Sequence, residues 1–317
     1  MKRLKPLWIS LTSVFGVLAI AAVTGYFVTD NFSAAINMHF NTKTYQLVDN
    51  PDAKPEYPFR SEYDFIEYDE NGRPVENAGE DLFDEDKDII SLVEEEGAVL
   101  LWNHDKALPL RNETTVSLLG RGSQSIVETG SGSGWIPSTR SVNLKDAFNE
   151  VGVECNPTLW DFYSKQAKRT EKNSACEENA TLAVNETAWS RYDDATKNSF
   201  ATYGDAAIVV LSRTGGEYAD LDRNGTDSID GSKNYLLMTK NEKDLLDNVL
   251  QYKASGVFKK VILLFNSGNP FDMEPFKPYF EDIDAAMYIG EVGTSGAAAV
   301  ARLIVGEASP SGHLTDT

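Results

Sequence analysis

Hydrophobic positions divide the chain into two contrasting regions. Near the start, an uncharged run extends from Leu7 to Val28 or Thr29 and ends at Asp30. From about residue 115 onward, short β-rich runs alternate with stretches whose apolar residues recur at helical spacing. The predicted strands are Thr115–Leu119, Ala206–Leu211, Val261–Phe265 and Ala285–Ile289. The predicted helices are Val142–Val151, Thr158–Ala167, Lys240–Ser255 and Ser295–Val305.

Two of these strands, in the runs AAIVVLS (206–212) and VILLF (261–265), are apolar on both faces. That pattern is typical of central strands in a parallel sheet with helices on both sides. The alternation of strands and helices therefore predicts an α/β fold, a three-layer α/β/α sandwich with a mainly parallel sheet. Ligands of such sheets gather at the carboxyl ends of the strands. A functional site is therefore expected in the loops after Leu119, Leu211, Phe265 and Ile289.

The first apolar run is long enough to form a transmembrane helix. Wound as an α-helix it reaches roughly 33 Å, which is enough for the hydrocarbon layer. Lys2, Arg3 and Lys5 precede it, so the basic end is expected in the cytoplasm and the body outside the cell. A cleaved signal peptide is the alternative, because Ala19–Ala21 resembles a small-residue cleavage site. Since the apolar run continues past that site, we favour a single-pass anchor in the cell membrane.

The distribution of polar residues along the chain indicates its division into segments. We assign residues 1–29 to the anchor, 30–79 to a polar connector rich in proline and aromatic residues, and 80–317 to the α/β domain. Residues Glu80–Glu96 are strongly acidic, as expected for the solvated face of a helix. An apolar stripe at helical spacing is predicted to be the buried face of this helix, formed by Leu82, Ile89, Ile90 and Val93.

The two cysteines leave two alternatives open. Export would allow a disulfide between Cys155 and Cys176, because the extracellular space is oxidising. Equally, they are two independent thiols, with Cys155 buried at the end of a short strand.

Composition narrows the chemistry. The 317 residues include 29 basic and 49 acidic side chains, a net charge of −20. This balance argues against a nucleic-acid partner, because binding phosphates needs clustered Lys and Arg. Two cysteines and three histidines leave little material for a zinc centre. Carboxylate groups are the reactive side chains that the chain has in quantity.

The loop after the first predicted strand is rich in glycine, reading GRGSQSIVETGSGSGW from Gly120 to Trp135. Glycines at this density let a backbone approach a ligand closely. A phosphate-binding loop is disfavoured because no GK[ST] ending follows. A purely structural loop remains an alternative to one that lines a cleft, in which Ser131, Ser133 and Trp135 would contact a ligand.

The loop after the second predicted strand carries the most promising carboxylate. Glu217 follows Gly215 and Gly216, and Asp220 and Arg223 lie close behind in the sequence. Nearby acidic groups raise the pKa of a carboxyl, as a general acid working near neutral pH requires. The segment DLDRNGTDSID looks like a calcium loop but lacks its twelve-residue spacing and terminal Glu. An ordinary solvated surface carboxylate is the plain alternative for Glu217.

The last two loops favour structural roles. Asn266 and Asn269 in NSGNPFDM, with the turn at Pro270, are expected to cap the segment that follows. The final stretch joins a glycine turn at Gly290–Gly293 to a helix of small residues, which predicts close packing on the sheet.

Taken together, five segments resemble the C-terminal α/β-sandwich domain of glycoside hydrolase family 3, which includes β-glucosidases and β-xylosidases. They occur in the order found in that family and extend over residues from about 80 to 317. The resemblance implies a sheet of about six strands. The segments are Glu95–Leu110, Thr129–Gly134, Gly215–Arg223, Val261–Met273 and Tyr288–Leu314.

The resemblance implies a role for Glu217. In that family the Glu of an EGxDR-like loop is the general acid/base, and Glu217 matches it, with Asp220 at the position of the Asp. Tyr218 replaces the usual Gly and Leu221 stands where Arg is common, although Arg223 follows directly. The resemblance further implies that Asp220 and Arg223 hold this loop, and that the loop containing Ser131, Ser133 and Trp135 borders the sugar subsites. It implies neither a cofactor nor a metal.

The resemblance also implies a missing part. The nucleophile of the family is an Asp in a separate (β/α)8-barrel, and no barrel-sized sequence is present here. We therefore expect the chain to be part of a longer protein, with the barrel elsewhere, and to be inactive alone. The expected partner is carbohydrate, a β-glucoside or oligosaccharide. A non-catalytic module that binds carbohydrate or protein remains the alternative, favoured by Tyr218 and the missing nucleophile.

Overall fold

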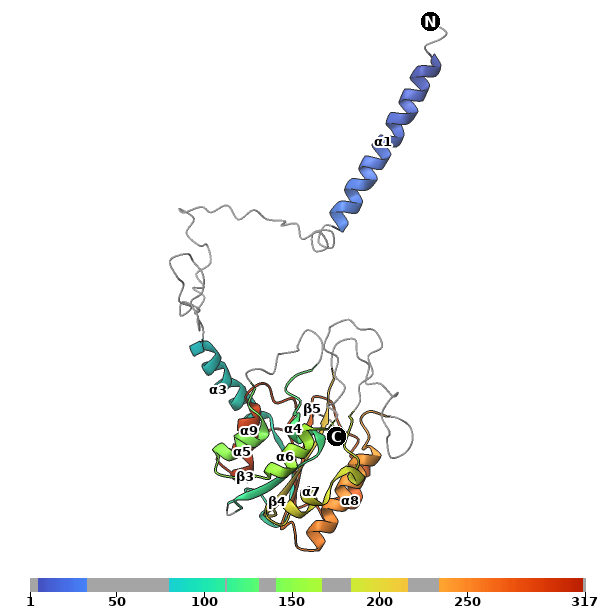
Figure 1. Cartoon of the computed structure of the whole chain (residues 1–317). Helices are drawn as coiled ribbons and strands as arrows, with labels where there is room; N and C mark the ends of the chain where they lie inside the picture. The colour runs from blue at the N-terminus through green and yellow to red at the C-terminus, as the bar shows by residue number, and fades with distance from the viewer. Residues whose placement is uncertain are drawn as a thin grey trace. The chain divides into compact units, whose positions relative to one another are not determined.

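The computed structural model describes residues 5–32, 80–111, 113–130, 141–166, 184–215 and 234–315 (Figure 1). The chain divides into two compact units, residues 1–64 and 65–317, and each is described by itself. Beyond its first three residues, the predicted connector 30–79 lies outside the described residues.

The first unit contains one long helix, α1, Lys5–Asn31. Its segment Ser10–Thr29 has a mean hydropathy of 2.0, and its side chains are exposed. The hydroxyls of Thr12 and Thr29 donate hydrogen bonds to the carbonyls of Trp8 and Gly25 in the preceding turn, so the helix satisfies these polar groups itself. The helix is long and apolar enough to cross a membrane, and a signal sequence would have the same properties.

Within the described residues of the second unit, six strands form one sheet in the order β1-β6-β5-β4-β2-β3. Neighbouring strands are parallel except β1 and β6, which are antiparallel. This confirms the predicted α/β fold and mainly parallel sheet. The strands are β1 Val99–Asn103, β2 Thr115–Leu119, β3 Glu154–Cys155, β4 Ala206–Arg213, β5 Val261–Ser267 and β6 Ala285–Tyr288.

The sheet is covered on both faces. Ile208 and Val210 of β4 face one hydrophobic cluster, whereas Ala207, Val209 and Leu211 face the other. The first cluster receives side chains from α5 (Leu144–Glu150) and α9 (Gly296–Val305), and the second from α6 (Pro157–Ser164) and α8 (Lys240–Ala254). Figure 1 shows α5 and α9 on one side of the sheet and α8 on the other. The predicted three layers are therefore present.

The helix boundaries follow local capping. Thr239 and Glu242 form a capping box at the start of α8, and Asn143 and Asn156 cap α5 and α6. All four predicted helices are found within a few residues of their expected ends. Strand β1 and helix α7 (Asp194–Ser199) were not predicted. The other described helical segments are α3 Glu80–Gly97, α4 Arg121–Gln124, η1 His104–Lys106, η4 Trp189–Arg191 and η5 Glu274–Tyr279. Of these, the short segments α4, η1, η4 and η5 were not predicted either.

The buried face of α3 differs from the prediction. Ile89 and Val93 are 53% and 65% exposed, whereas Ser91 and Glu94 are only 8% exposed and face α9. The reason is the close approach of the two helices: a Cβ at Gly296 would lie 3.4 Å from the Cβ of Glu94. Small and polar side chains fit this narrow contact, and the Ser295 hydroxyl donates to the Lys87 carbonyl across it. The prediction is therefore wrong for Ile89 and Val93, whereas Ile90 is half-buried and its Cγ2 lies close to Gly293. The side chain of Leu82 lies outside the described part.

Cys155 is a free, buried thiol in β3. Burial raises the pKa of this thiol to about 12, so it stays protonated and unreactive near neutral pH. This agrees with the second of the two alternatives for the cysteines, while Cys176 lies outside the described residues.

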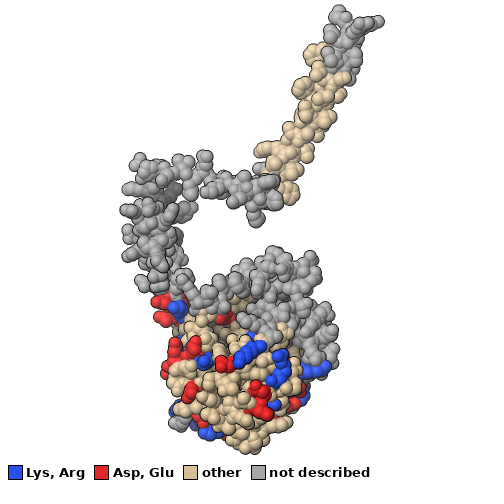
Figure 2. All heavy atoms as spheres, viewed as in Figure 1, with Lys and Arg blue, Asp and Glu red and all other residues tan. Residues whose placement is uncertain are grey.

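Acidic and basic side chains share the visible surface of the domain. Figure 2 shows Lys and Arg interspersed with Asp and Glu on this face. Among the described residues of the domain, surface charges form ion pairs such as Lys259–Asp205 at 2.5 Å and Arg302–Glu95 at 2.6 Å. Such surface pairs contribute at most about 1 kcal/mol each, so stability rests on the two apolar clusters.

Glu94 provides a test of the α3–α9 contact. Its Oε1 is buried and has no hydrogen-bond partner among the described residues, and burial raises the pKa of the carboxyl from 4.5 to about 9. Between these values the unfolded chain ionises while the folded chain keeps its proton, so stability falls as the pH rises, by up to about 1.4 kcal/mol per pH unit. Glu94→Gln removes this dependence. Urea unfolding of both proteins between pH 5 and pH 8 should therefore show free energies of unfolding that diverge as the pH increases.

The control is Asp88→Asn, an exposed carboxylate on the same helix, whose curve should run parallel to that of the wild type. If the Glu94→Gln curve is also parallel to the wild-type curve, Glu94 is not buried as a protonated acid.

Candidate functional site

The candidate site is the edge of the sheet where the parallel strands end. β2, β4, β5 and β6 are parallel neighbours, so their carboxyl ends meet at the same edge. The described segments at this edge are 120–130 after β2, 212–215 at the end of β4, 266–269 at the end of β5 and 289–291 after β6.

Asn266 holds three of these segments together. Its side chain is fully buried, and its Oδ1 accepts from the Val127 N–H at 2.6 Å and from the Ser212 hydroxyl at 2.8 Å. Its Nδ2 donates to the carbonyls of Val127 and Gly290 at 3.0 and 2.8 Å. The expectation that Asn266 caps the segment after it is therefore wrong. Its amide binds across the sheet instead, because three neighbouring segments offer buried backbone and hydroxyl groups that need partners.

Glycines bring the starts of two loops into contact. A Cβ on Gly130 would lie 3.2 Å from the carbonyl oxygen of Gly215, and a Cβ on Gly215 would lie 2.5 Å from the Nδ2 of Asn269. Glycine at position 215 leaves room for the Asn269 amide, and any larger residue there would require Asn269 to move. Residues 131–140 follow Gly130 and residues 216–233 follow Gly215, so both loops leave the sheet edge at neighbouring points.

Glu291 lies beside this junction and was missed by the sequence analysis. Its half-buried carboxylate accepts a hydrogen bond from the backbone N–H of Gly130 and lies against Gly268. Burial raises the pKa of the carboxyl, and the bond from Gly130 partly offsets this. A carboxylate that follows a parallel strand by three residues was the available signal, but the neighbouring glycine turn favoured a structural interpretation.

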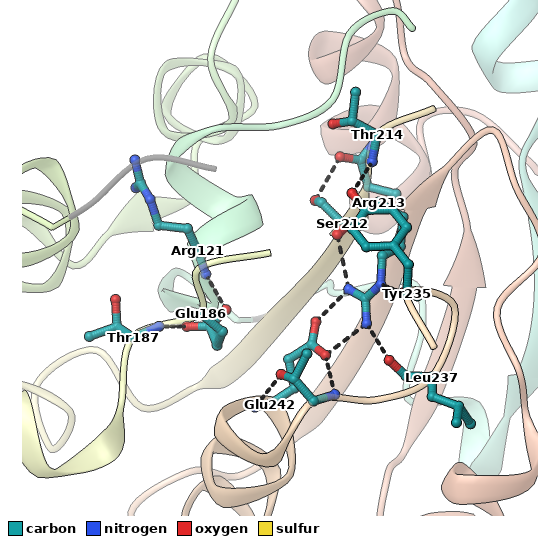
Figure 3. Close-up of polar contacts among 11 residues, drawn as sticks. Arg121, Glu186, Thr187, Ser212, Arg213, Thr214, Tyr235, Leu237 and Glu242 are labelled. Atoms are coloured by element: carbon teal, nitrogen blue, oxygen red, sulfur yellow. Dashed lines mark hydrogen bonds and ion pairs between the residues drawn. The ribbon is translucent and has the colours of Figure 1, made fainter. Parts of the chain in front are cut away.

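A buried ion pair lies at the end of β4 (Figure 3). Arg213 and Glu242 are both fully buried, and the two guanidinium nitrogens Nη1 and Nη2 bind the two carboxylate oxygens at 2.6 and 2.8 Å. The same guanidinium donates to the carbonyls of Tyr235 and Leu237. Glu242 opens α8, so the pair fixes the end of β4 to the start of that helix.

A second buried carboxylate supports the segment after β2 (Figure 3). Glu186 accepts hydrogen bonds from the backbone N–H groups of Arg121 and Thr187 at 2.7 and 2.9 Å. Burial raises the pKa of Glu186 to about 7. The Tyr163 hydroxyl accepts from the Gly120 N–H at 2.6 Å and is hydrogen-bonded to the Tyr192 hydroxyl. The backbone at the start of the glycine-rich loop is therefore held by two buried side chains, Tyr163 and Glu186.

The predicted site residues lie outside the described residues. The structure describes the residues that precede them, Gly130 and Gly215, and brings these together. The residues concerned are Ser131, Ser133, Trp135, Glu217, Asp220 and Arg223.

No group of three or more His, Cys, Asp or Glu side chains suitable for a metal ion occurs among the described residues. The reactive groups described at this edge are single carboxyl groups, which lie beside backbone N–H groups and side-chain amides.

The buried pair predicts unequal effects of neighbouring substitutions in α8. Glu242→Ala leaves the Arg213 charge buried without its carboxylate and should lower the free energy of unfolding by about 3–5 kcal/mol. Lys243→Ala breaks a solvent-accessible pair with Asp247 and a contact with Tyr279, and should cost about 1 kcal/mol or less. Urea unfolding followed by tryptophan fluorescence measures both. Equal losses in the two variants would show that the buried pair does not hold this edge.

Comparison with known proteins identifies the fold and the family. The model of the glycosyl hydrolase family 3 C-terminal domain matches residues 98–317. A β-glucosidase from Ruminococcus albus is 30% identical over 237 residues, which cover 71% of this chain and 22% of that protein. β-Glucosidase A from Butyrivibrio fibrisolvens is 27% identical over 238 residues, covering 70% of this chain and 27% of that protein. The chain thus spans about a quarter of the length of these relatives.

Solved structures agree with this fold. β-Glucosidase 3B from Thermotoga neapolitana, in complex with α-D-glucose, superposes with a TM-score of 0.57 at 20% identity and covers 72% of this chain and 30% of its own. A β-glucosidase from Paenibacillus barengoltzii gives a TM-score of 0.53 at 23% identity, covering 70% of this chain and 23% of its own. Because the family model matches most of the chain, this protein belongs to glycosyl hydrolase family 3 and carries the C-terminal domain of that family.

Proposed function

We propose that the chain supplies the general acid/base half of a retaining, β-glucosidase-like site, with Glu217 as the acid/base. The observation that carries this proposal is the contact between Gly130 and Gly215 at the carboxyl edge of the sheet. The loop predicted to border the sugar and the loop predicted to carry the acid begin there, side by side. Glu217 is two residues from Gly215 in the sequence. Two extended residues reach at most about 7 Å, which supports the proposal that Glu217 acts at this edge.

The proposed chemistry is a double displacement. Glu217 gives its proton to the glycosidic oxygen as the bond to the anomeric carbon breaks, and a carboxylate nucleophile takes the sugar as a glycosyl ester. Glu217, now ionised, removes a proton from water, whose oxygen attacks the anomeric carbon and releases the nucleophile. The two carboxyl groups must stand about 5–5.5 Å apart, so the nucleophile has to face this edge from outside the domain.

We assign the nucleophile to a (β/α)8-barrel elsewhere in the full protein. The support is that the chain spans about a quarter of its β-glucosidase relatives. The substrate would be a β-glucoside or an oligosaccharide, and no cofactor is needed. Asp220 and Arg223 would hold the acid/base loop, whereas Ser131, Ser133 and Trp135 would border the sugar.

We further propose that the protein is anchored in the cell membrane with its body outside. The support is helix α1, whose apolar segment is unburied and follows Lys2, Arg3 and Lys5. Basic residues next to a span favour the cytoplasmic side. An anchored hydrolase would act on carbohydrate at the cell surface.

One prediction concerns the chain by itself. A single carboxyl half-site cannot form and hydrolyse the glycosyl ester, so the chain Met1–Thr317, purified in detergent, should not hydrolyse aryl β-glucosides above the uncatalysed rate. Release of 4-nitrophenol is the measurement. Sustained turnover by the purified chain would mean that it contains its own nucleophile.

The acid/base assignment is tested in the complete protein that contains this chain. Glu217→Ala should lower turnover of phenyl β-glucoside by roughly 100- to 10,000-fold, because the leaving phenol is no longer protonated. Azide, a nucleophile that needs no general base, should restore turnover of an activated aryl glucoside and yield a glycosyl azide. Steady-state kinetics and product analysis measure the two effects.

Asp230→Asn, another acidic position of the same loop, is the matched control and should retain turnover. Unchanged turnover in Glu217→Ala, or a loss that azide does not rescue, would contradict the assignment. A complete protein that binds oligosaccharides without hydrolysing them would instead support the non-catalytic module that Tyr218 favours.

A further inference from the structure

The acid/base loop is closed at its base by one buried arginine. Residues 216–233 follow Gly215 at the end of β4 and precede Asn234, just ahead of α8. Arg213, on the outgoing stem, donates from Nε to the Tyr235 carbonyl at 2.5 Å and from Nη2 to the Leu237 carbonyl at 2.8 Å. A single side chain therefore binds two backbone groups of the returning stem.

Arg213 is itself held on all sides. The Glu242 carboxylate binds it with two hydrogen bonds, and its guanidinium carbon lies 4.6 Å from the centre of the Phe271 ring. Glu242 also accepts from the backbone N–H of Thr239, at 2.8 Å, in the capping box of α8. The guanidinium is thereby fixed to the first turn of a 15-residue helix. Planar, two-point pairing of this kind fixes orientation as well as distance.

A second bond joins the stems one residue closer to the loop. The backbone N–H of Thr214 donates to the hydroxyl of Tyr235 at 2.9 Å. The Tyr235 side chain is 1% exposed and its ring lies 5.6 Å from the guanidinium carbon of Arg213. The hydroxyl thus holds the backbone three residues before Glu217 in the sequence.

We infer that Arg213 and Tyr235 are positioning residues for the general acid: they close the base of the 216–233 loop and so set where Glu217 stands relative to the glycosidic oxygen. The inference rests on the proposed function of Glu217. A general acid must come within about 2.6–3.2 Å of the oxygen it protonates, and a misplacement of about 1 Å costs on the order of 100-fold in rate. A long loop meets this requirement only if its stems are fixed.

The test uses Tyr235→Phe in the complete protein, compared on two substrates. Phenyl β-glucoside has a poor leaving group that needs the acid, whereas 2,4-dinitrophenyl β-glucoside leaves without protonation. We expect kcat/KM to fall roughly 10- to 100-fold for the phenyl substrate and about threefold or less for the dinitrophenyl substrate. A loss of folded protein would lower both values by the same factor, so the ratio of the two isolates the position of the acid.

Tyr279→Phe is the matched control, because it removes a hydroxyl that donates to Asp247 on the outer part of α8. Its two kcat/KM values should stay within about twofold of the wild type. Glu217→Ala, measured alongside, should show the same leaving-group dependence as Tyr235→Phe but to a larger extent.

The outcomes separate the two proposals. If Glu217→Ala depends on the leaving group but Tyr235→Phe lowers both substrates equally, or lowers neither, the positioning role is wrong while the acid/base role stands. If Glu217→Ala itself shows no dependence on the leaving group, the proposed function fails first.

Discussion

The ion pair between Arg213 and Glu242 is the interaction on which the functional edge of this domain depends. Both side chains are fully buried, and removing a charge from water costs several kcal/mol per ion unless a partner compensates it. The compensation is complete, because the two carboxylate oxygens and the carbonyls of Ser212, Tyr235 and Leu237 together accept hydrogen bonds from all five guanidinium N–H groups. The pair therefore holds the end of β4 against the start of α8 and against residues 235–237. The two ends of the 216–233 loop are thereby fixed relative to each other.

Hydrogen bonds of a neutral side chain connect the ends of the other strands at the same edge. The Asn266 amide binds the segment after β2, the end of β4 and the turn after β6. Glycine at position 130 then lets the backbone lie close to the carbonyl oxygen of Gly215, and glycine at position 215 leaves room for the Asn269 amide. This arrangement separates two tasks: the buried groups fix geometry, and the loops beyond them carry the groups proposed for catalysis.

Membership of family 3 and the proposed division of the site are consistent with this architecture. A half-site needs a rigid base, because the two reacting carboxyl groups would come from different domains and their separation of about 5–5.5 Å must be held closely. The half-buried Glu291, beside the junction of the two loops, adds a hydrogen-bond acceptor to this base. A membrane helix at the start of the chain would alter where such an enzyme works and leave its chemistry unchanged.

The sequence by itself determined the layered fold. Strands such as 206–211 and 261–265 are apolar on both faces, which is possible only between two layers of helices, and strong local capping set the ends of α8. β1 escaped prediction because it is a five-residue edge strand directly after an acidic helix. The tertiary structure decided which face of α3 is buried, since the small residues of α9 favour close approach over apolar area. It also decided the partners of Arg213, Asn266 and Glu291, because the groups that each one binds are far apart in the chain and meet only when the strands align.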